Sequence, residues 1–128
     1  MNPNSTTSLI DILSPFKRLI EVGIGSRIDI AHTLSENRNV VATDIHPCEI
    51  PKGIQFFLDD ICNPTLEIYY KADIIYALNL PPELHRPTLD VASQVGSKFL
   101  FTTLGNDFPE ISVQIETIPG ETIYWALE

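Results

Sequence analysis

The feature that most limits the fold of this chain is an alternation of short apolar runs with segments of helical or turn character. Apolar runs typical of buried strands occupy 18–22, 40–43, 54–58, 72–78 and 98–103. Because neighbouring parallel strands need a crossover between them, this order predicts an α/β fold with a parallel sheet. The expected architecture is therefore three-layered and Rossmann-like, with helices on both faces of the sheet.

The end of the chain breaks this alternation. The segments "ISVQIE" and "TIYWAL" both alternate apolar and polar residues, and Pro119-Gly120 lies midway between them. This pattern predicts a β-hairpin. Only the short segment "LGNDFPE" separates the fifth run from Ile111, which is too little chain for a parallel crossover. The hairpin must therefore join the sheet antiparallel or cover its edge.

Helix boundaries follow from a few residues. A short amphipathic helix is expected over 9–13, after a polar and loose segment at 1–8. Ser26 is expected to cap the next helix, with Asp29 three residues later in an arrangement like a capping box. Gly96 is placed to end a later helix, because glycine adopts the left-handed conformation found at helix C-termini.

Length and charge narrow the class of protein. The 128 residues are expected to form a single domain, and the formal net charge of −9 disfavours direct binding of nucleic acid. The 2 cysteines do not form a disulfide framework, and no apolar run is long enough to cross a membrane. A cytoplasmic protein is expected.

Polar residues gather where the predicted strands end. Glu21, Gly23 and Gly25 follow the first strand, and Asp44 ends the second, 19 residues after Gly25 (44 − 25). In parallel sheets, ligands bind at the carboxyl ends of the strands, and an acid at this spacing suits two ribose hydroxyls. Ile28 stands where a dinucleotide-binding motif has its third glycine, and Glu21 would oppose a pyrophosphate. These residues favour a nucleoside with a cationic part over NAD.

Three segments resemble the motifs of class I S-adenosylmethionine-dependent methyltransferases: "IEVGIG", "VVATDI" and "FFLDDI". The resemblance covers roughly residues 17–103 and extends to a group of small, uncharacterised archaeal proteins with a reduced methyltransferase-like fold. It implies S-adenosylmethionine as the cofactor, with Asp44 at the ribose and Asp60 at the adenine. Glu21 and the turn backbone would face the methionine part, and Arg27 occupies the place of a frequent third glycine. The implied cofactor-binding residues are Glu21, Gly23, Ile24, Gly25, Asp44, Ile45, Asp59, Asp60 and Asn79.

Catalytic residues are not identified by the sequence. The segment "NLPPEL" resembles the Asn-Pro-Pro-aromatic motif with which some methyltransferases hold an amine, but Leu80 intervenes and Glu83 replaces the aromatic residue. Asn79, His85 and Asp107 are candidates near the reacting atoms, whereas a start of a proline-rich helix explains the same segment structurally. No metal site is predicted, because the His and Cys residues lack metal-ligand spacing.

Two functions from different classes stay open. The first is methyl transfer from S-adenosylmethionine, with a protein partner completing the substrate site. The second is a regulatory module that binds this cofactor or another nucleoside without chemistry, and NAD binding is a weaker third. Tyr124 and Trp125, on the expected hairpin, suggest that the chain forms a homodimer.

Overall fold

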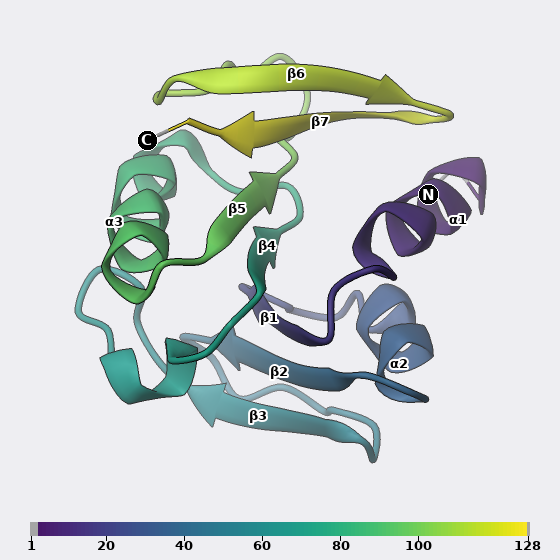
Figure 1. Cartoon of the computed structure of the whole chain (residues 1–128), viewed down its shortest axis with the longest axis vertical. Helices are drawn as coiled ribbons and strands as arrows, with labels where there is room; N and C mark the ends of the chain where they lie inside the picture. The colour runs from purple at the N-terminus through teal and green to yellow at the C-terminus, as the bar shows by residue number, and fades with distance from the viewer. Residues whose placement is uncertain (1–2, 128) are drawn as a thin grey trace.

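The computed structural model describes residues 3–127, and its centre is a seven-stranded sheet with the order β3-β2-β1-β4-β5-β7-β6 (Figure 1). The first five strands in this order are parallel, and β7 pairs antiparallel with both β5 and β6. The strands are β1 (Arg18–Val22), β2 (Asn39–Asp44), β3 (Ile54–Leu58), β4 (Ile74–Ala77), β5 (Lys98–Phe101), β6 (Val113–Ile118) and β7 (Glu121–Ala126).

Helices cover the two faces of the sheet unequally. The helices α1 (Pro3–Leu13) and α2 (Asp29–Ser35) lie on one face, and α3 (His85–Val95) lies on the other (Figure 1). Two short 3₁₀ helices, η1 (Leu66–Tyr69) and η2 (Pro82–Leu84), complete the α3 side. Because side chains alternate along a strand, Leu19 packs toward α1 and α2 while Ile20 packs toward α3.

The predicted fold class and the C-terminal hairpin are confirmed. Each of the five expected parallel strands is present within three residues of its predicted bounds, and β6 and β7 turn at Pro119-Gly120. The helix α3 ends at Gly96, whose φ of 72° is left-handed, as the glycine predicted. No helix within residues 3–127 is long and apolar enough to cross a membrane.

The prediction of a loose N-terminal segment is wrong for residues 3–8, which belong to α1; residues 1 and 2 lie outside the described part. Distant polar contacts hold this helix start in place. The Ser5 hydroxyl donates to Glu121 at 3.1 Å, and the Ser8 hydroxyl donates to the Pro119 carbonyl at 3.0 Å. Both acceptors lie at the tip of the hairpin, which a local pattern does not reveal.

The predicted cap at Ser26 is also wrong. The helix α2 begins at Asp29 with Ile28 as its N-cap residue, and no side chain makes a capping hydrogen bond. Asp29 instead stands in the first turn, where its charge suits the helix dipole. Residues 26–28 therefore form a turn that carries Arg27 toward the sheet.

Two connections lack the helix that commonly covers such a sheet. Residues 45–53, between β2 and β3, and residues 102–112, between β5 and β6, contain no helix. The second connection is fastened by His85, which is fully buried and packs against Phe101. Its Nδ1 accepts the backbone N–H of Glu110 at 3.1 Å, so its Nε2–H donates to the Leu80 carbonyl at 3.0 Å.

The hairpin aromatics Tyr124 and Trp125 are half-buried. Trp125 is half-buried against Phe16, and its Nε1 donates to Glu116 at 2.9 Å. Tyr124 is half-buried against Phe101, with ring centroids 5.4 Å apart. These two rings attach the hairpin to the rest of the core.

We expect His85→Leu to lower the free energy of unfolding by about 2–4 kcal/mol, because it leaves the buried Leu80 carbonyl without a partner and removes the hydrogen bond to the Glu110 N–H. Urea denaturation followed by circular dichroism measures the loss. His32→Leu, at an exposed position of α2, is the matched control and should change stability by no more than about 0.5 kcal/mol. Equal effects of the two substitutions would contradict a structural role for His85.

Candidate functional site

The carboxyl ends of β1, β2 and β3 are joined by hydrogen bonds. The backbone N–H groups of Gly23 and Ile24 donate to the Thr43 carbonyl at 2.9 and 3.1 Å. The Gly25 N–H donates to Oδ2 of Asp44 at 2.9 Å, and the Asp59 N–H donates to the Asp44 carbonyl at 3.0 Å. The glycine turn and Asp44 therefore lie together, as the sequence predicted, with Ile24 buried and Ile45 beside them.

The two glycines of the turn have backbone conformations that favour glycine. Gly23 has a φ of 70° and Gly25 a φ of 56°, and both are exposed. A Cβ atom at either position would meet no atom within 4 Å. The turn therefore presents bare backbone to open space, which allows a ligand to approach closely.

Asp44 and Ile45 border the turn on the β2 side. Asp44 is half-buried, and its Oδ1 accepts the His46 N–H at 3.0 Å while Oδ2 accepts the Gly25 N–H. The next side chain, Ile45, is 60% exposed although it is apolar. A cleft of about 580 Å³ adjoins Asp44, lined by residues of the turn and of the loop after β2, including Ser26, His46 and Cys48.

Glu21 lies under the turn and is shut off from water. It is 1% exposed, and its Oε1 accepts the hydroxyl of the fully buried Tyr76 at 2.8 Å. Burial raises the pKa of Glu21 to about 8, against the lowering effects of the Tyr76 hydrogen bond and the Arg27 charge. Burial likewise raises the pKa of Tyr76. Glu21 is therefore a largely protonated acid at neutral pH.

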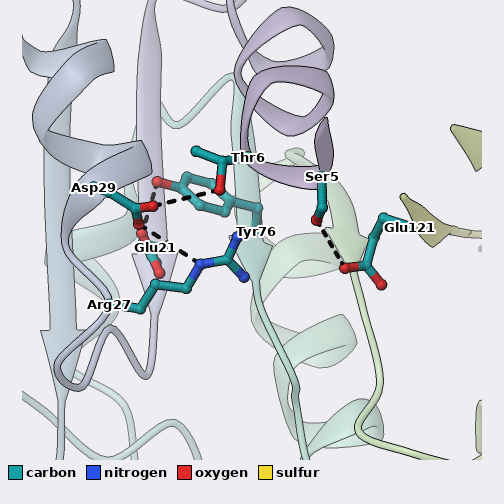
Figure 2. Close-up of polar contacts among 7 residues, drawn as sticks. All are labelled: Ser5, Thr6, Glu21, Arg27, Asp29, Tyr76 and Glu121. Atoms are coloured by element: carbon teal, nitrogen blue, oxygen red, sulfur yellow. Dashed lines mark hydrogen bonds and ion pairs between the residues drawn. The ribbon is translucent and has the colours of Figure 1, made fainter. Parts of the chain in front are cut away.

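Arg27 lies beside Glu21 and below the Tyr76 ring and the start of α1 in the view of Figure 2. Its Nε lies 3.6 Å from Oδ1 of Asp29, and 21% of its side chain is exposed. Its Nε and Nη2 atoms are buried and have no hydrogen-bond partner. Thr6 of α1 reaches the same group and donates to Oδ2 of Asp29 at 3.5 Å.

The other predicted site residues are bound elsewhere. The Asp59 carboxylate accepts the Thr65 N–H at 3.0 Å and the Tyr69 hydroxyl at 2.8 Å, so it fastens η1 to the sheet. Asp60 is exposed and accepts the Cys62 N–H at 2.9 Å, which closes a local turn.

Asn79 follows β4 and has a left-handed φ of 52°. Its backbone N–H donates to Oγ1 of Thr102 at 2.8 Å, and its side chain is exposed. Of the other candidates for chemistry, His85 has both ring nitrogens engaged, and Asp107 is exposed on the connection after β5. No group of three or more His, Cys, Asp or Glu side chains within the described residues is arranged to hold a metal ion.

Sequence reasoning missed the partners of Glu21. Arg27 was noted only as a departure from a glycine, and Tyr76 was taken as part of an apolar strand. A tyrosine within the run "DIIYAL" was the available signal, because a buried hydroxyl needs a hydrogen-bond partner. The pairing of β1 with β4 then sets Tyr76 directly beside Glu21.

Comparison with known proteins identifies the family. The family model described as "Uncharacterised protein family (UPF0146)" matches residues 4–127. The chain belongs to this family. A UPF0146 protein of the archaeon Halobacterium salinarum is 44% identical over 97 residues, which cover 75% of each chain. The UPF0146 protein MJ0688 of Methanocaldococcus jannaschii is 30% identical over 112 residues, covering 84% of this chain and 82% of the relative.

The solved structures with a similar fold include S-adenosylmethionine-dependent methyltransferases. A TehB-like enzyme of this type from Corynebacterium glutamicum matches with a TM-score of 0.67 and 15% identity, covering 98% of this chain and 86% of that one. An RNA methyltransferase from Salinibacter ruber, solved with S-adenosyl-L-homocysteine, matches with a TM-score of 0.63 and 12% identity, covering 98% and 91%. This UPF0146 protein therefore has a reduced methyltransferase-like fold, as the sequence predicted.

Buried Glu21 should make the stability of the protein fall as pH rises. The unfolded chain ionises this glutamate near pH 4.5, whereas the folded chain holds its proton until about pH 8. The stabilisation is thus complete below pH 4.5 and is lost between these two values, on the order of 5 kcal/mol in total. Glu21→Gln keeps an acceptor for Tyr76 and should remove this decline.

Thermal unfolding of both proteins across that pH range is the measurement. The thermal midpoint of the wild type should fall relative to that of Glu21→Gln as pH rises toward 8. Glu49→Gln, at an exposed position, should parallel the wild type. Parallel curves for wild type and Glu21→Gln would mean that Glu21 is ionised in the folded protein throughout.

Proposed function

We propose that this UPF0146 protein binds S-adenosylmethionine at the carboxyl ends of β1 and β2 and transfers its methyl group to an acceptor. The observation that carries the proposal is the Arg27 guanidinium beside the glycine turn, with two buried nitrogen atoms that lack hydrogen-bond partners. Buried donors of this kind are rare in proteins unless a ligand or water satisfies them. A carboxylate is one of the groups that a guanidinium binds strongly, through two parallel hydrogen bonds.

The charges around the turn match the amino-acid end of the cofactor. The methionine part carries a carboxylate and an ammonium group, and Arg27 lies close to two acids, Glu21 and Asp29. We infer that Arg27 binds the carboxylate while the Asp29 carboxylate favours the ammonium. Glu21 is buried and largely protonated at neutral pH, so it adds no charge to the subsite and does not meet solvent.

The same features disfavour a dinucleotide. A pyrophosphate needs the N-terminus of a helix at the glycine turn, but α2 begins only at Asp29 and has an acid in its first turn. The sheet also differs from the dinucleotide-binding order 3-2-1-4-5-6, because antiparallel β7 is inserted between β5 and β6. NAD is therefore a poorer fit than S-adenosylmethionine.

The nucleoside end has its own set of residues in this proposal. Asp44 accepts the ribose hydroxyls, since Oδ2 accepts one hydrogen bond from Gly25 of the turn, Oδ1 accepts one from His46 of the next loop, and each oxygen retains a further lone pair. The exposed Ile45 side chain covers one face of the adenine, which explains an apolar residue that is 60% exposed at a strand end. Asp60, which follows β3, accepts a hydrogen bond from the adenine amino group in this proposal.

The bound cofactor supplies a methyl group on a positively charged sulfur. The task of the chain is then to hold this methyl in line with the acceptor and to exclude water, since proximity provides much of the rate. Asn79 is the side chain we place at the acceptor. It lies at the end of β4, and its left-handed backbone, held by Thr102, directs an exposed amide that can accept a hydrogen bond from an amine or hydroxyl.

One observation favours the second hypothesis, a binding module without chemistry. His85 was a candidate base, and both of its ring nitrogens are committed to backbone groups. A binding module would bind S-adenosylmethionine and S-adenosylhomocysteine equally and would transfer no methyl group to an acceptor. Both hypotheses share the cofactor site, so binding is the first test.

Titration calorimetry with S-adenosylmethionine, S-adenosylhomocysteine, adenosine and NAD tests the site. We expect micromolar binding of the first two, weaker binding of adenosine and no binding of NAD. Asp44→Asn should weaken binding of the first three by about tenfold or more, because it removes one anionic acceptor. Equal binding of NAD and S-adenosylmethionine would contradict the assignment.

Arg27→Met separates the two ends of the site. It removes the guanidinium and retains an apolar stem, so the affinity for S-adenosylmethionine should fall about tenfold or more while the affinity for adenosine, which lacks a carboxylate, stays unchanged. Arg86→Met, an exposed arginine on α3, is the matched control for the lost charge. Equal losses for both ligands would place Arg27 in the fold rather than in the subsite.

A further inference from the structure

The strand β6 forms one edge of the sheet and carries unpaired backbone groups. Within residues 3–127 it pairs only with β7, and the sheet ends there (Figure 1). The Leu127 N–H donates to the Ser112 carbonyl at 2.9 Å, so Ser112 directs its carbonyl toward β7. Because the direction alternates along an antiparallel strand, Gln114 and Glu116 also face β7. The N–H and C=O groups of Val113, Ile115 and Thr117 therefore point outward from the sheet.

The edge lacks the usual protection against another strand. Proteins commonly guard an edge with lysine, proline, a bulge or a covering element. The strand β6 contains neither lysine nor proline, and its one charge, Glu116, is held by the indole N–H of Trp125. Ile115 is 63% exposed at the middle of the strand. The other edge, β3, is shorter and is followed directly by the acids Asp59 and Asp60.

We propose that β6 pairs antiparallel with β6 of a second copy of this chain, about a two-fold axis at Ile115, and so joins two sheets into one. The outward groups fix the register. Ile115 meets Ile115, and Val113 of one copy meets Thr117 of the other. Both kinds of pair bring outward N–H and C=O groups face to face, as hydrogen-bonded antiparallel pairs require.

Charge and burial favour this register over the two registers that place the axis one residue away. An axis at Glu116 would set two Glu116 carboxylates directly opposite, and like charges at that position destabilise a sheet. An axis at Gln114 would leave Thr117 of each copy opposite Ile111, which lies before the strand and is buried. The axis at Ile115 instead sets Gln114 opposite Glu116 of the other copy. The dimer therefore contains two pairs in which an amide lies opposite a carboxylate.

The side chains on the α3 side of β6 suit this pairing. Val113, Ile115 and Thr117 are all β-branched and share one face, beside Tyr124 and Ala126 of β7. No helix follows β5 in residues 102–112 to cover this face. Pairing of the two copies removes Ile115 from water at the axis, where it packs against its own counterpart.

Sedimentation velocity of the wild-type protein from micromolar to sub-millimolar concentration tests the proposal. We expect a reversible dimer that strengthens with added salt, because each chain carries a formal net charge of −9. Ile115→Lys sets two positive charges together at the axis and should raise the dimer Kd by about tenfold or more. Circular dichroism confirms that the variant is folded, which is expected because this side chain is exposed.

Gln114 tests the register itself. Gln114→Lys should lower the dimer Kd and Gln114→Glu should raise it, each by about two- to thirtyfold, because the side chain faces Glu116 in both halves of the dimer. Gln55→Lys and Gln55→Glu make the same changes of net charge on exposed β3 and should leave the Kd unchanged. A monomer at every concentration, a dimer that Ile115→Lys leaves intact, or equal shifts from the Gln114 and Gln55 pairs would overturn the proposal.

Discussion

A carboxylate removed from water must be neutralised, hydrogen-bonded or paired. The residues around Glu21 meet that requirement. Tyr76 on the neighbouring strand supplies a hydroxyl, and burial supplies a bound proton. Arg27 then lies beside the pair, and the turn after Gly25 is shaped to bring it there instead of beginning a helix. The helix α2 begins only at Asp29, and α1 packs beside it through the buried residues Leu9 and Leu13.

The second constraint is the loss of covering elements. With no helix in 45–53 or 102–112, side-chain hydrogen bonds help to hold the loop after β2 and the connection after β5. Asp44 performs this role near the glycine turn, and His85 performs it beside β5. A side chain that helps to bind a ligand at such a site also holds a loop, so binding and local stability are coupled there.

The sequence predicted the regular part of the fold because its signals are local. Apolar runs, Gly96 and Pro119-Gly120 act within a few residues of themselves, and the strands and hairpin appear where these signals place them. The missed features all depend on distant partners. The helical residues 3–8 make hydrogen bonds from Ser5 and Ser8 to the distant hairpin, and α2 begins beyond Ser26, where Arg27 pairs with Asp29.

The candidate site likewise has features that the sequence predicts and features that depend on the sheet topology. The glycine turn and Asp44 lie together, since parallel strand ends must meet at one edge of a sheet. The partner of Glu21 depends on the pairing of β1 with β4, and the outward groups of β6 depend on its place at the edge of the sheet. Neither can be derived from a motif, because each is a property of the topology.

The bonds from Ser5 and Ser8 to the hairpin tip join segments 116 and 111 positions apart. Closing so long a loop is entropically costly, and contacts of this kind form late in folding. During synthesis α1 leaves the ribosome before the hairpin does. Ser5 and Ser8 therefore reach their acceptors only after the hairpin has been made. We therefore expect the hydrogen bonds that tie the start of α1 to the hairpin to form only after β7 has joined the sheet.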